Sequence, residues 1–164
     1  MRHPVDRAPT EAISLRRARP EDVSRVVEIE KDGFRNPWSR ELVERELGHA
    51  WSQVLLAADA DATGAERILG YIVFWLVHDE VHVLNVGTAL EARRRGVGRA
   101  LMRAAEEAGR ARGARLSTLE VRRSNAPAIA LYDALGYRQV GVRPNYYAEE
   151  KEDAIVMVKA LRVG

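Results

Sequence analysis

The sequence of 164 residues contains no cysteine. Disulfide bonds, thiolate metal sites and a cysteine acyl-enzyme intermediate are therefore excluded. Long apolar runs are also missing, and a segment such as 72–77 is far too short to span a bilayer. Residues 1–12 contain charges and prolines but no apolar stretch, so they do not resemble a secretory signal. From these absences we expect a cytoplasmic protein with no membrane partner.

Lysine is scarce, since it occurs only at Lys31, Lys151 and Lys159, although Lys and Arg together number 26. The formal net charge is +2, and a general excess of arginine over lysine is typical of a GC-rich genome. Local clusters of arginine are therefore more informative than the total charge. The length suits one domain that can bury a core without cross-links. We expect residues 1–12 to be a flexible lead-in and residues 13–164 to form one domain.

The spacing of apolar residues predicts an α/β protein. Alternation of apolar and polar residues indicates strands, and recurrence at every third or fourth position indicates helices. Pro20 and Ser39 suit the beginnings of two helices, because proline needs no N–H donor there and a serine side chain can cap the first turn. The expected order is a strand at 13–17, helices at 20–31 and 39–47, strands at 53–58, 68–77 and 80–88, a helix from 97 that closes at Gly113, a strand at 116–121, a helix at 126–135, and strands at 137–142 and 154–159. This order predicts a mixed, mostly antiparallel sheet flanked by helices.

The most informative stretch joins a predicted strand to a predicted helix and reads RRRGVGRAL at residues 93–101. Its two glycines let the backbone approach an anion closely, and the first N–H groups of the helix lack internal partners. Together with the helix dipole, these groups favour a phosphate. A P-loop needs Gly-Lys-Ser/Thr, which is absent, and a dinucleotide fingerprint needs Gly or Ala where Leu101 stands. A glycine-rich turn with solvated arginines is the alternative.

Downstream, residues 119–137 read LEVRRSNAPAIALYDALGY. Together with the loop at 93–99, this segment closely resembles the GNAT superfamily of acetyltransferases. The segments at 36–39, 143–147 and 152–157 add a similarity to the RimI type, which acetylates the N-terminal alanine of a small-subunit ribosomal protein. The resemblance covers about residues 13–160. It implies the GNAT fold, acetyl-CoA as co-substrate, no metal, and a protein or peptide N-terminus as partner.

The resemblance also implies where acetyl-CoA binds. The end of a strand, at 86–88, should pair its backbone amides with the pantetheine, and the arginine-rich loop should bind the pyrophosphate. The family usually reads Ile/Val-Ala-Val-x-Pro at that strand end, and this chain departs from the pattern at Thr88 and in the missing proline. The backbone amides of the strand can still form hydrogen bonds with the pantetheine. Asn125 should contact the pantetheine arm, although it could also serve only as a helix cap. The expected set is Val86, Gly87, Thr88, Arg93, Arg94, Arg95, Gly96, Val97, Gly98, Arg99 and Asn125.

Two residues are candidates for acid–base catalysis. An ammonium group cannot attack a thioester, and an α-amine with a pKa of about 7.7–8.0 loses its proton more easily than a lysine with a pKa of about 10.4. Glu120, at a strand end beside the expected cleft, is the candidate general base, acting through a water. The resemblance implies that Tyr132 protonates the departing thiolate. The alternatives are a salt-bridge carboxylate for Glu120 and a core aromatic side chain for Tyr132.

Three aromatic residues are candidates for substrate binding. In N-terminal acetyltransferases, tyrosines at the positions of Tyr146 and Tyr147 clamp the first peptide units, and we expect both in the loop between the last two strands. A hairpin with two exposed tyrosines is the alternative. Trp38 would wall the same groove, or act instead as a helix staple. His78 and His82 flank a turn at four-residue spacing, but no third ligand clearly converges on them, so a metal is not expected.

We expect direct transfer in a ternary complex by a monomeric enzyme. A GNAT enzyme that acetylates a small amine or a lysine side chain is the first alternative. The second is a non-catalytic acyl-CoA sensor or a nucleic-acid-binding module that uses the arginines at 93–99 and 122–123. Nucleic-acid sites interleave aromatic with basic residues. These clusters lack aromatic residues, so no nucleic-acid partner is expected.

Overall fold

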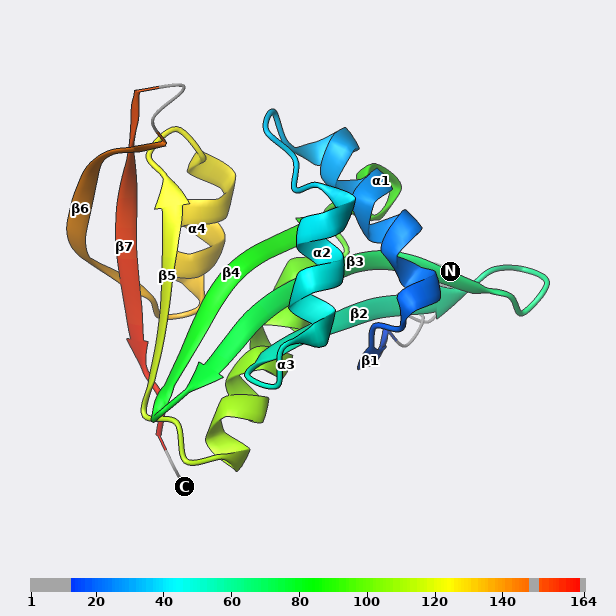
Figure 1. Ribbon diagram of the computed structural model, residues 1–164, viewed down its shortest axis with the longest axis horizontal. Coiled ribbons are helices and arrows are strands. Elements are labelled where there is room, and N and C mark those ends of the chain that lie inside the picture. Colours follow the sequence, from blue (N-terminus) through cyan, green and yellow to red (C-terminus); the bar gives the residue numbers. More distant parts are fainter. Residues whose placement is uncertain (1–12, 148–150, 163–164) are drawn as a thin grey trace, which may run out of the picture.

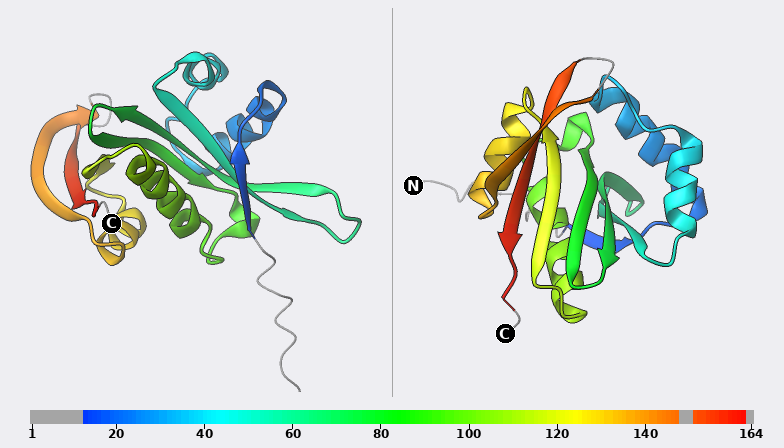
Figure 2. Two further views of the ribbon diagram at one scale, coloured as in Figure 1. Left: turned by 90° about the horizontal axis from the view of Figure 1, so that it is seen from below. Right: turned by 60° about the vertical axis from the view of Figure 1, so that its left-hand side comes forward.

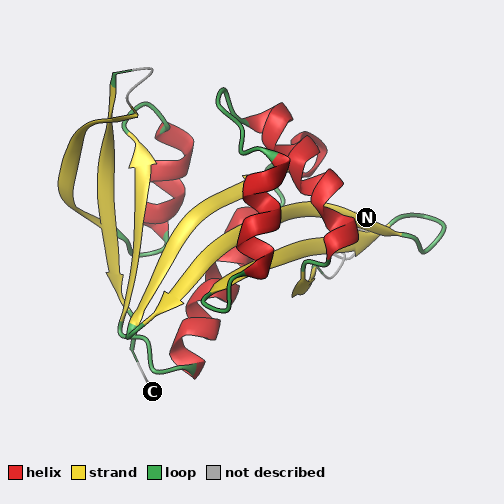
Figure 3. Cartoon of the chain, in the orientation of Figure 1, coloured by secondary structure: helices red, strands yellow, loops and turns green. Residues whose placement is uncertain are grey.

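A sheet of seven strands runs through the part of the chain that the computed structural model describes, residues 13–147 and 151–162. The expected lead-in, 1–12, lies outside the described residues. Neighbouring strands are antiparallel except for β4 and β5, so the mixed, mostly antiparallel sheet is confirmed (Figure 3). The strands are β1 (Ser14–Arg17), β2 (Ser52–Ala60), β3 (Glu66–Val77), β4 (Glu80–Thr88), β5 (Leu116–Arg122), β6 (Arg138–Tyr147) and β7 (Glu152–Ala160), and their order across the sheet is β1-β2-β3-β4-β5-β7-β6.

Helices cover both faces of this sheet. Two lie on one face and two on the other (Figures 1 and 2). The first pair is α1 (Val23–Gly33) and α2 (Arg40–Gly48), and the second is α3 (Val97–Ala111) and α4 (Ala126–Ala134); short 3₁₀ turns are η1 (Pro20–Asp22) and η2 (Leu90–Ala92). Within the described ranges, none of these helices has the length and apolar character needed to cross a membrane.

The two helix starts expected at Pro20 and Ser39 are present, the first in a modified form. Pro20 begins the 3₁₀ turn η1, and the α-helix follows from Val23. Asp22 is buried at this junction and accepts hydrogen bonds from the Arg16 guanidinium at 2.8 and 2.9 Å. At the second start, the Leu42 N–H donates to the Ser39 hydroxyl at 3.2 Å, which is the predicted N-cap.

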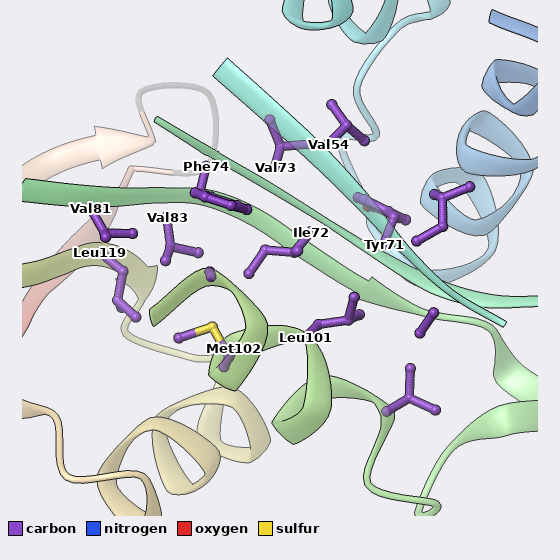
Figure 4. Close-up of a cluster of buried hydrophobic side chains, with 14 of the residues drawn as sticks. Val54, Tyr71, Ile72, Val73, Phe74, Val81, Val83, Leu101, Met102 and Leu119 are labelled. Carbon is purple, nitrogen blue, oxygen red and sulfur yellow. The ribbon is translucent and has the colours of Figure 1, made fainter. Parts of the chain in front are cut away.

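The core fills the space between the sheet and its helices. On the α3 side, Leu101 and Met102 point toward the sheet, near Ile72 and Val83 (Figure 4), and all four are buried. On the other side, α2 is tied to β3 because the Trp75 indole donates to Glu46 at 2.8 Å. Burial on both faces leaves the sheet little freedom to bend, so the separation of its strands is well defined.

The parallel strands β4 and β5 pair along only part of their length. Their register runs from Glu80↔Leu116 to Val83↔Leu119 and stops there. Beyond this point the two strands diverge, as Figure 1 shows. On its other side, β4 pairs with β3 as far as Thr88. The half of β4 from residue 84 to 88 therefore has one unpaired backbone edge, which faces the space between the strands.

The expectation that Tyr146 and Tyr147 lie in a loop is wrong, because both residues belong to β6. Pro144 and Gly141 weaken the strand pattern in the sequence. β6 is the outermost strand of the sheet, where the missing N–H of a proline removes no ladder bond on the open side. The pairing with β7 is irregular between Arg143 and Tyr147, so the strand bends as it reaches the two tyrosines.

The packing of α3 on β4 requires a glycine at position 109. A Cβ atom there would lie 2.3 Å from Val81 Cγ2. We expect Gly109→Ala to lower the free energy of unfolding by about 1–3 kcal/mol, because overpacking outweighs the better helix propensity of alanine. Urea unfolding would measure this loss, and Val81→Ala in the same chain should restore part of it. Gly48→Ala in α2, where nothing lies within 4 Å of the added Cβ, is the control; an equal loss in both variants would contradict the steric explanation.

Candidate active site

A cleft of about 880 Å³ opens where β4 and β5 diverge. Residues from α1, the α1–α2 connection, β4, the start of α3, β5, α4 and the end of β6 line it. The cleft thus passes between the two strands and is open to both faces of the sheet. Most of the residues expected to bind acetyl-CoA or to catalyse transfer lie along it.

The arginine-rich loop forms the end of the cleft next to α3. Gly96 has a φ of +77°, a left-handed conformation that glycine adopts without strain, and it caps α3. The first helical N–H that returns to a carbonyl is that of Ala100, which donates to Gly96 at 3.0 Å. The N–H groups of residues 97–99 precede it and point out of the helix end. At Gly98, an added Cβ would lie 3.2 Å from Leu131 Cδ2, so a larger residue would narrow this end.

The three consecutive arginines of the loop do not all face the cleft. Arg93 and Arg94 line it, together with Arg99 from the first turn of α3. Arg95 does not line it; its guanidinium instead donates to Asp59 Oδ2 at 3.0 Å. The sequence predicts that Arg95 contacts the cofactor. In the structure, its side chain turns away from the cleft toward the buried carboxylate of Asp59. The remaining positive charges and the helix N–H groups fit the pyrophosphate of acetyl-CoA.

The exposed edge of β4 supplies the second part of the cofactor site. Val86, Gly87 and Thr88 all line the cleft, as expected. Gly87 also has a packing role, since a Cβ there would lie 2.4 Å from Cε1 of the buried Tyr71. The Tyr71 ring on the neighbouring strand therefore leaves room only for a glycine at position 87. The backbone edge remains open for hydrogen bonds to a pantetheine arm.

Asn125 both caps α4 and lines the cleft. Its side-chain oxygen accepts a hydrogen bond from the Ala128 N–H at 3.2 Å. The cap explains why an asparagine suits this position, and the location at the cleft places its side chain near a ligand as well. The two interpretations of the sequence are therefore compatible.

Glu120 lies on the face of β5 that is opposite to α3. Its neighbours Leu119 and Val121 share the other face with Ser117, whose hydroxyl lies 2.7 Å from the Tyr137 hydroxyl. Tyr137 in turn donates to Glu106 of α3, which identifies that face. Glu120 lines the cleft and is partly exposed, and its carboxylate is 3.2 Å from the Arg143 guanidinium. It is thus a salt-bridge partner that also reaches the cleft.

Tyr132 reaches the same cleft from α4, on the other face of the sheet. It is 9% exposed, and its ring packs edge-on against Tyr137. Burial raises the pKa of Tyr132 to about 12, and the nearby Tyr147 adds to this effect. Its phenol therefore keeps its proton near neutral pH, which is the state that a general acid requires. Glu120 and Tyr132 approach the gap between β4 and β5 from opposite sides.

The candidate substrate residues are only partly brought together. Trp38 and Tyr147 line the cleft, and the Arg122 guanidinium lies 3.8 Å from the centre of the Tyr147 ring. Tyr146 is 49% exposed and does not line the cleft, although its ring contacts that of Tyr147 edge-on. Burial and the nearby Glu120 carboxylate raise the pKa of Tyr146. Tyr147 is therefore placed to contact a substrate in the cleft, and Tyr146 stands at its outer rim.

Glu30 is a cleft residue that the sequence did not single out. It is 1% exposed, and its carboxylate accepts hydrogen bonds from the Trp38 N–H at 2.9 Å and from the Asn85 amide. Burial raises the pKa of Glu30 to about 7, although both hydrogen bonds oppose the shift. The available signal in the sequence was a glutamate on the apolar face of a predicted helix, which is rare without a partner.

The described residues contain no group of three or more His, Cys, Asp or Glu side chains that could hold a metal ion. The groups present in the cleft are proton donors and acceptors, a helix N-terminus with unpaired N–H groups and an open strand edge. They suit acyl transfer from a thioester to an amine.

Comparisons with known proteins agree with this geometry. The profile of the Acetyltransferase (GNAT) family matches residues 23–137. The [ribosomal protein bS18]-alanine N-acetyltransferase of Salmonella typhimurium is 34% identical over 138 residues, which are 83% of this chain and 89% of that protein. The crystal structure of the ribosomal-protein-S18-alanine N-acetyltransferase from Escherichia coli superposes with a TM-score of 0.80 at 27% identity, over 92% of this chain and 95% of the other.

The raised pKa of Glu30 predicts a pH-dependent stability. The folded state favours the protonated carboxyl, so stability should fall as pH rises from about 4.5 toward 7, where the folded protein must ionise a buried group. Glu30→Gln cannot ionise. The stability of this variant relative to wild type should therefore increase between pH 5 and pH 8, by up to about 3 kcal/mol at about 1.4 kcal/mol for each pKa unit. Thermal unfolding at both pH values measures this difference.

The matched control for this experiment is Glu41→Gln, which changes an exposed carboxylate on α2. Its stability relative to wild type should stay constant over the same pH range. If the curves of Glu30→Gln and wild type run parallel from pH 5 to pH 8, Glu30 does not titrate in this window.

Proposed function

Since the chain belongs to the GNAT acetyltransferase family and is an acetyl-CoA-dependent N-acetyltransferase, we propose that its acceptor is the N-terminal α-amine of a protein. The acceptor that we favour is the N-terminal alanine of a small-subunit ribosomal protein. The names of two similar proteins, both ribosomal-protein alanine N-acetyltransferases, support this choice. Such an acceptor is made in the cytoplasm, where the reaction would take place.

The single observation that carries the proposal is the position of Glu120 in the cleft. Its carboxylate lies at the end of the parallel pairing of β4 and β5, on the face of the sheet where α1 and Trp38 border the cleft. Tyr147 borders the cleft from the end of β6. An extended peptide N-terminus can enter between these aromatic side chains and bring its amine to the gap between the strands.

Acetyl-CoA supplies a thioester whose carbonyl carbon is attacked by the amine. On the acceptor side, Glu120 takes the proton that the α-ammonium must lose before its lone pair is available. On the other side, Tyr132 lines the cleft and donates its phenolic proton to the departing thiolate. The exposed amides of β4 can donate to the carbonyl oxygen, where negative charge develops as the C–N bond forms and the C–S bond breaks.

Acceptor choice is tested with a short basic peptide that begins Ala-Arg. We expect thiol release from acetyl-CoA with the free peptide, and none with the same peptide blocked at its N-terminus. A free α-amine is the better nucleophile near neutrality, because its pKa lies about 2.5 units below that of lysine. Equal rates with a polyamine and with the free peptide, or activity on the blocked peptide, would contradict an N-terminal acceptor and favour a small amine or a lysine.

The roles of Glu120 and Tyr132 are tested by near-isosteric variants. Glu120→Gln should lower kcat by about a hundredfold or more, since general base catalysis contributes about that much, and leave acetyl-CoA binding unchanged. Tyr132→Phe should also lower kcat, and the loss should be smaller with an acyl donor whose thiol leaves more readily. Stopped-flow measurements of thiol release would check both. Glu107→Gln, an exposed residue on α3, is the control, and wild-type turnover in either active-site variant would remove its assigned role.

A further inference from the structure

The loop before α3 presents two of three consecutive arginines to the cleft and turns the third away. Arg93 and Arg94 line the cleft, and Arg95 does not. Chemically the three side chains are equivalent. Side-chain chemistry therefore does not explain which two face the cleft, and the cause lies in the backbone of the loop and in its contacts.

Arg95 is held by a buried carboxylate on the second strand. The side chain of Asp59, near the end of β2, is fully buried. It accepts hydrogen bonds from Arg67 Nε and Nη2, both at 2.9 Å, and from Arg95 Nη2 at 3.0 Å. Arg67 lies directly opposite Asp59 on β3. The hydrogen bonds from Arg67, and to a smaller extent that from Arg95, hold the pKa of Asp59 below its ordinary value. The Asp59 carboxylate therefore remains a charged acceptor for Arg95.

The backbone on both sides of Arg95 is left-handed. Arg94 has a φ of +65° and Gly96 a φ of +77°. A residue with a side chain adopts this conformation only at an energetic cost, so the surrounding structure must hold Arg94 there. The contact between Arg95 and Asp59 comes directly after the strained residue. It is therefore positioned to hold the loop in the conformation that turns Arg93 and Arg94 inward.

A second contact steadies the start of the same segment. Arg25 of α1 donates to Glu91 at 2.6 Å and to the Ile68 carbonyl at 3.1 Å. Glu91 is largely exposed, so this ion pair is screened by solvent and contributes little alone. The pair between Arg95 and Asp59 differs, because the Asp59 carboxylate is removed from water and accepts hydrogen bonds from two guanidinium groups.

We propose that Asp59 is a positioning residue for acetyl-CoA binding: by holding Arg95 outside the cleft, it sets which arginines and helix N–H groups face the pyrophosphate. Asp59 touches neither substrate and acts through Arg95. The inference rests on the proposed binding of acetyl-CoA at residues 93–99 and is independent of the identity of the acceptor. The inference gives a residue of β2 a role in acetyl-CoA affinity. The glycine-rich motif at 93–99 does not by itself indicate this role.

The test measures the Kd of acetyl-CoA by calorimetry and the steady-state constants of the Asp59→Asn variant. We expect the Kd and the KM for acetyl-CoA to rise about tenfold, a typical result when a buried charged partner is lost. The kcat at saturating acetyl-CoA and the KM for the acceptor should remain within about twofold, because the acceptor side is untouched. A merely structural ion pair would lower the melting temperature and leave the Kd unchanged.

Arg95→Leu is a second variant that breaks the same contact. The Arg95 side chain is one-third exposed, so we expect this variant to fold even if Asp59→Asn does not. It should raise the Kd for acetyl-CoA to a similar extent. In its background, Asp59→Asn should raise the Kd little further, because both changes remove the contact between Arg95 and Asp59, whereas the contact between Asp59 and Arg67 of β3 holds no residue of the loop. The control is Asp61→Asn in the adjacent turn, whose carboxylate accepts hydrogen bonds from Thr63 and Ala65 of the same turn; its Kd should match wild type.

Two outcomes overturn the inference. One is an unchanged Kd in folded Arg95→Leu, and the other is a fully additive effect of the two substitutions. If the wild-type protein binds acetyl-CoA but acetylates no peptide, the proposed acceptor fails and the role of Asp59 is still decided by the Kd values. If wild type does not bind acetyl-CoA at all, both proposals fall.

Discussion

The end of the parallel pairing between β4 and β5, at Val83↔Leu119, is the constraint on which the rest of the site depends. If the pairing continued, the edge of β4 at residues 84–88 would be used within the sheet, and Glu120 would lie in a closed surface. β5 does not need this pairing for support, because β7 accompanies it as far as Arg122↔Ala154. The strands can therefore part without collapse, and a ligand can pass from one face of the sheet to the other.

Two buried carboxylates belong to the surroundings of this cleft and differ in their partners. Asp59 is surrounded by guanidinium groups, so its pKa is lowered and it remains ionised. Glu30 receives only neutral donors, the Trp38 N–H and the Asn85 amide, so burial dominates and its pKa is raised. Asp59 lies behind the arginine loop, and Glu30 joins the α1–α2 connection to β4. Similar burial thus has opposite electrostatic results, which the charge of the neighbours decides.

Much of the site could be predicted because its signals are local. The left-handed Gly96 and the crowded Gly98 belong to one short segment, and the N-caps at Ser39 and Asn125 depend on residues three positions away. The extension of the strand predicted at 137–142 as far as Tyr146 and Tyr147 was missed because Pro144 argues against a strand in general. It is tolerated here only because β6 lies at the edge of the sheet, and edge position depends on the order of all seven described strands.

The sequence by itself determined the order of the helices and strands, the α/β class, the glycine- and arginine-rich loop before a helix and the residue types available for proton transfer, since each depends on neighbours within a turn or a strand. Only the tertiary structure decided that Arg95 leaves the cleft for Asp59, 36 residues away, and that Glu30 meets Asn85, 55 residues away. Three adjacent arginines are indistinguishable in the sequence. The fold separates them because one buried carboxylate, brought near by the pairing of β2 and β3, lies within reach of one of them.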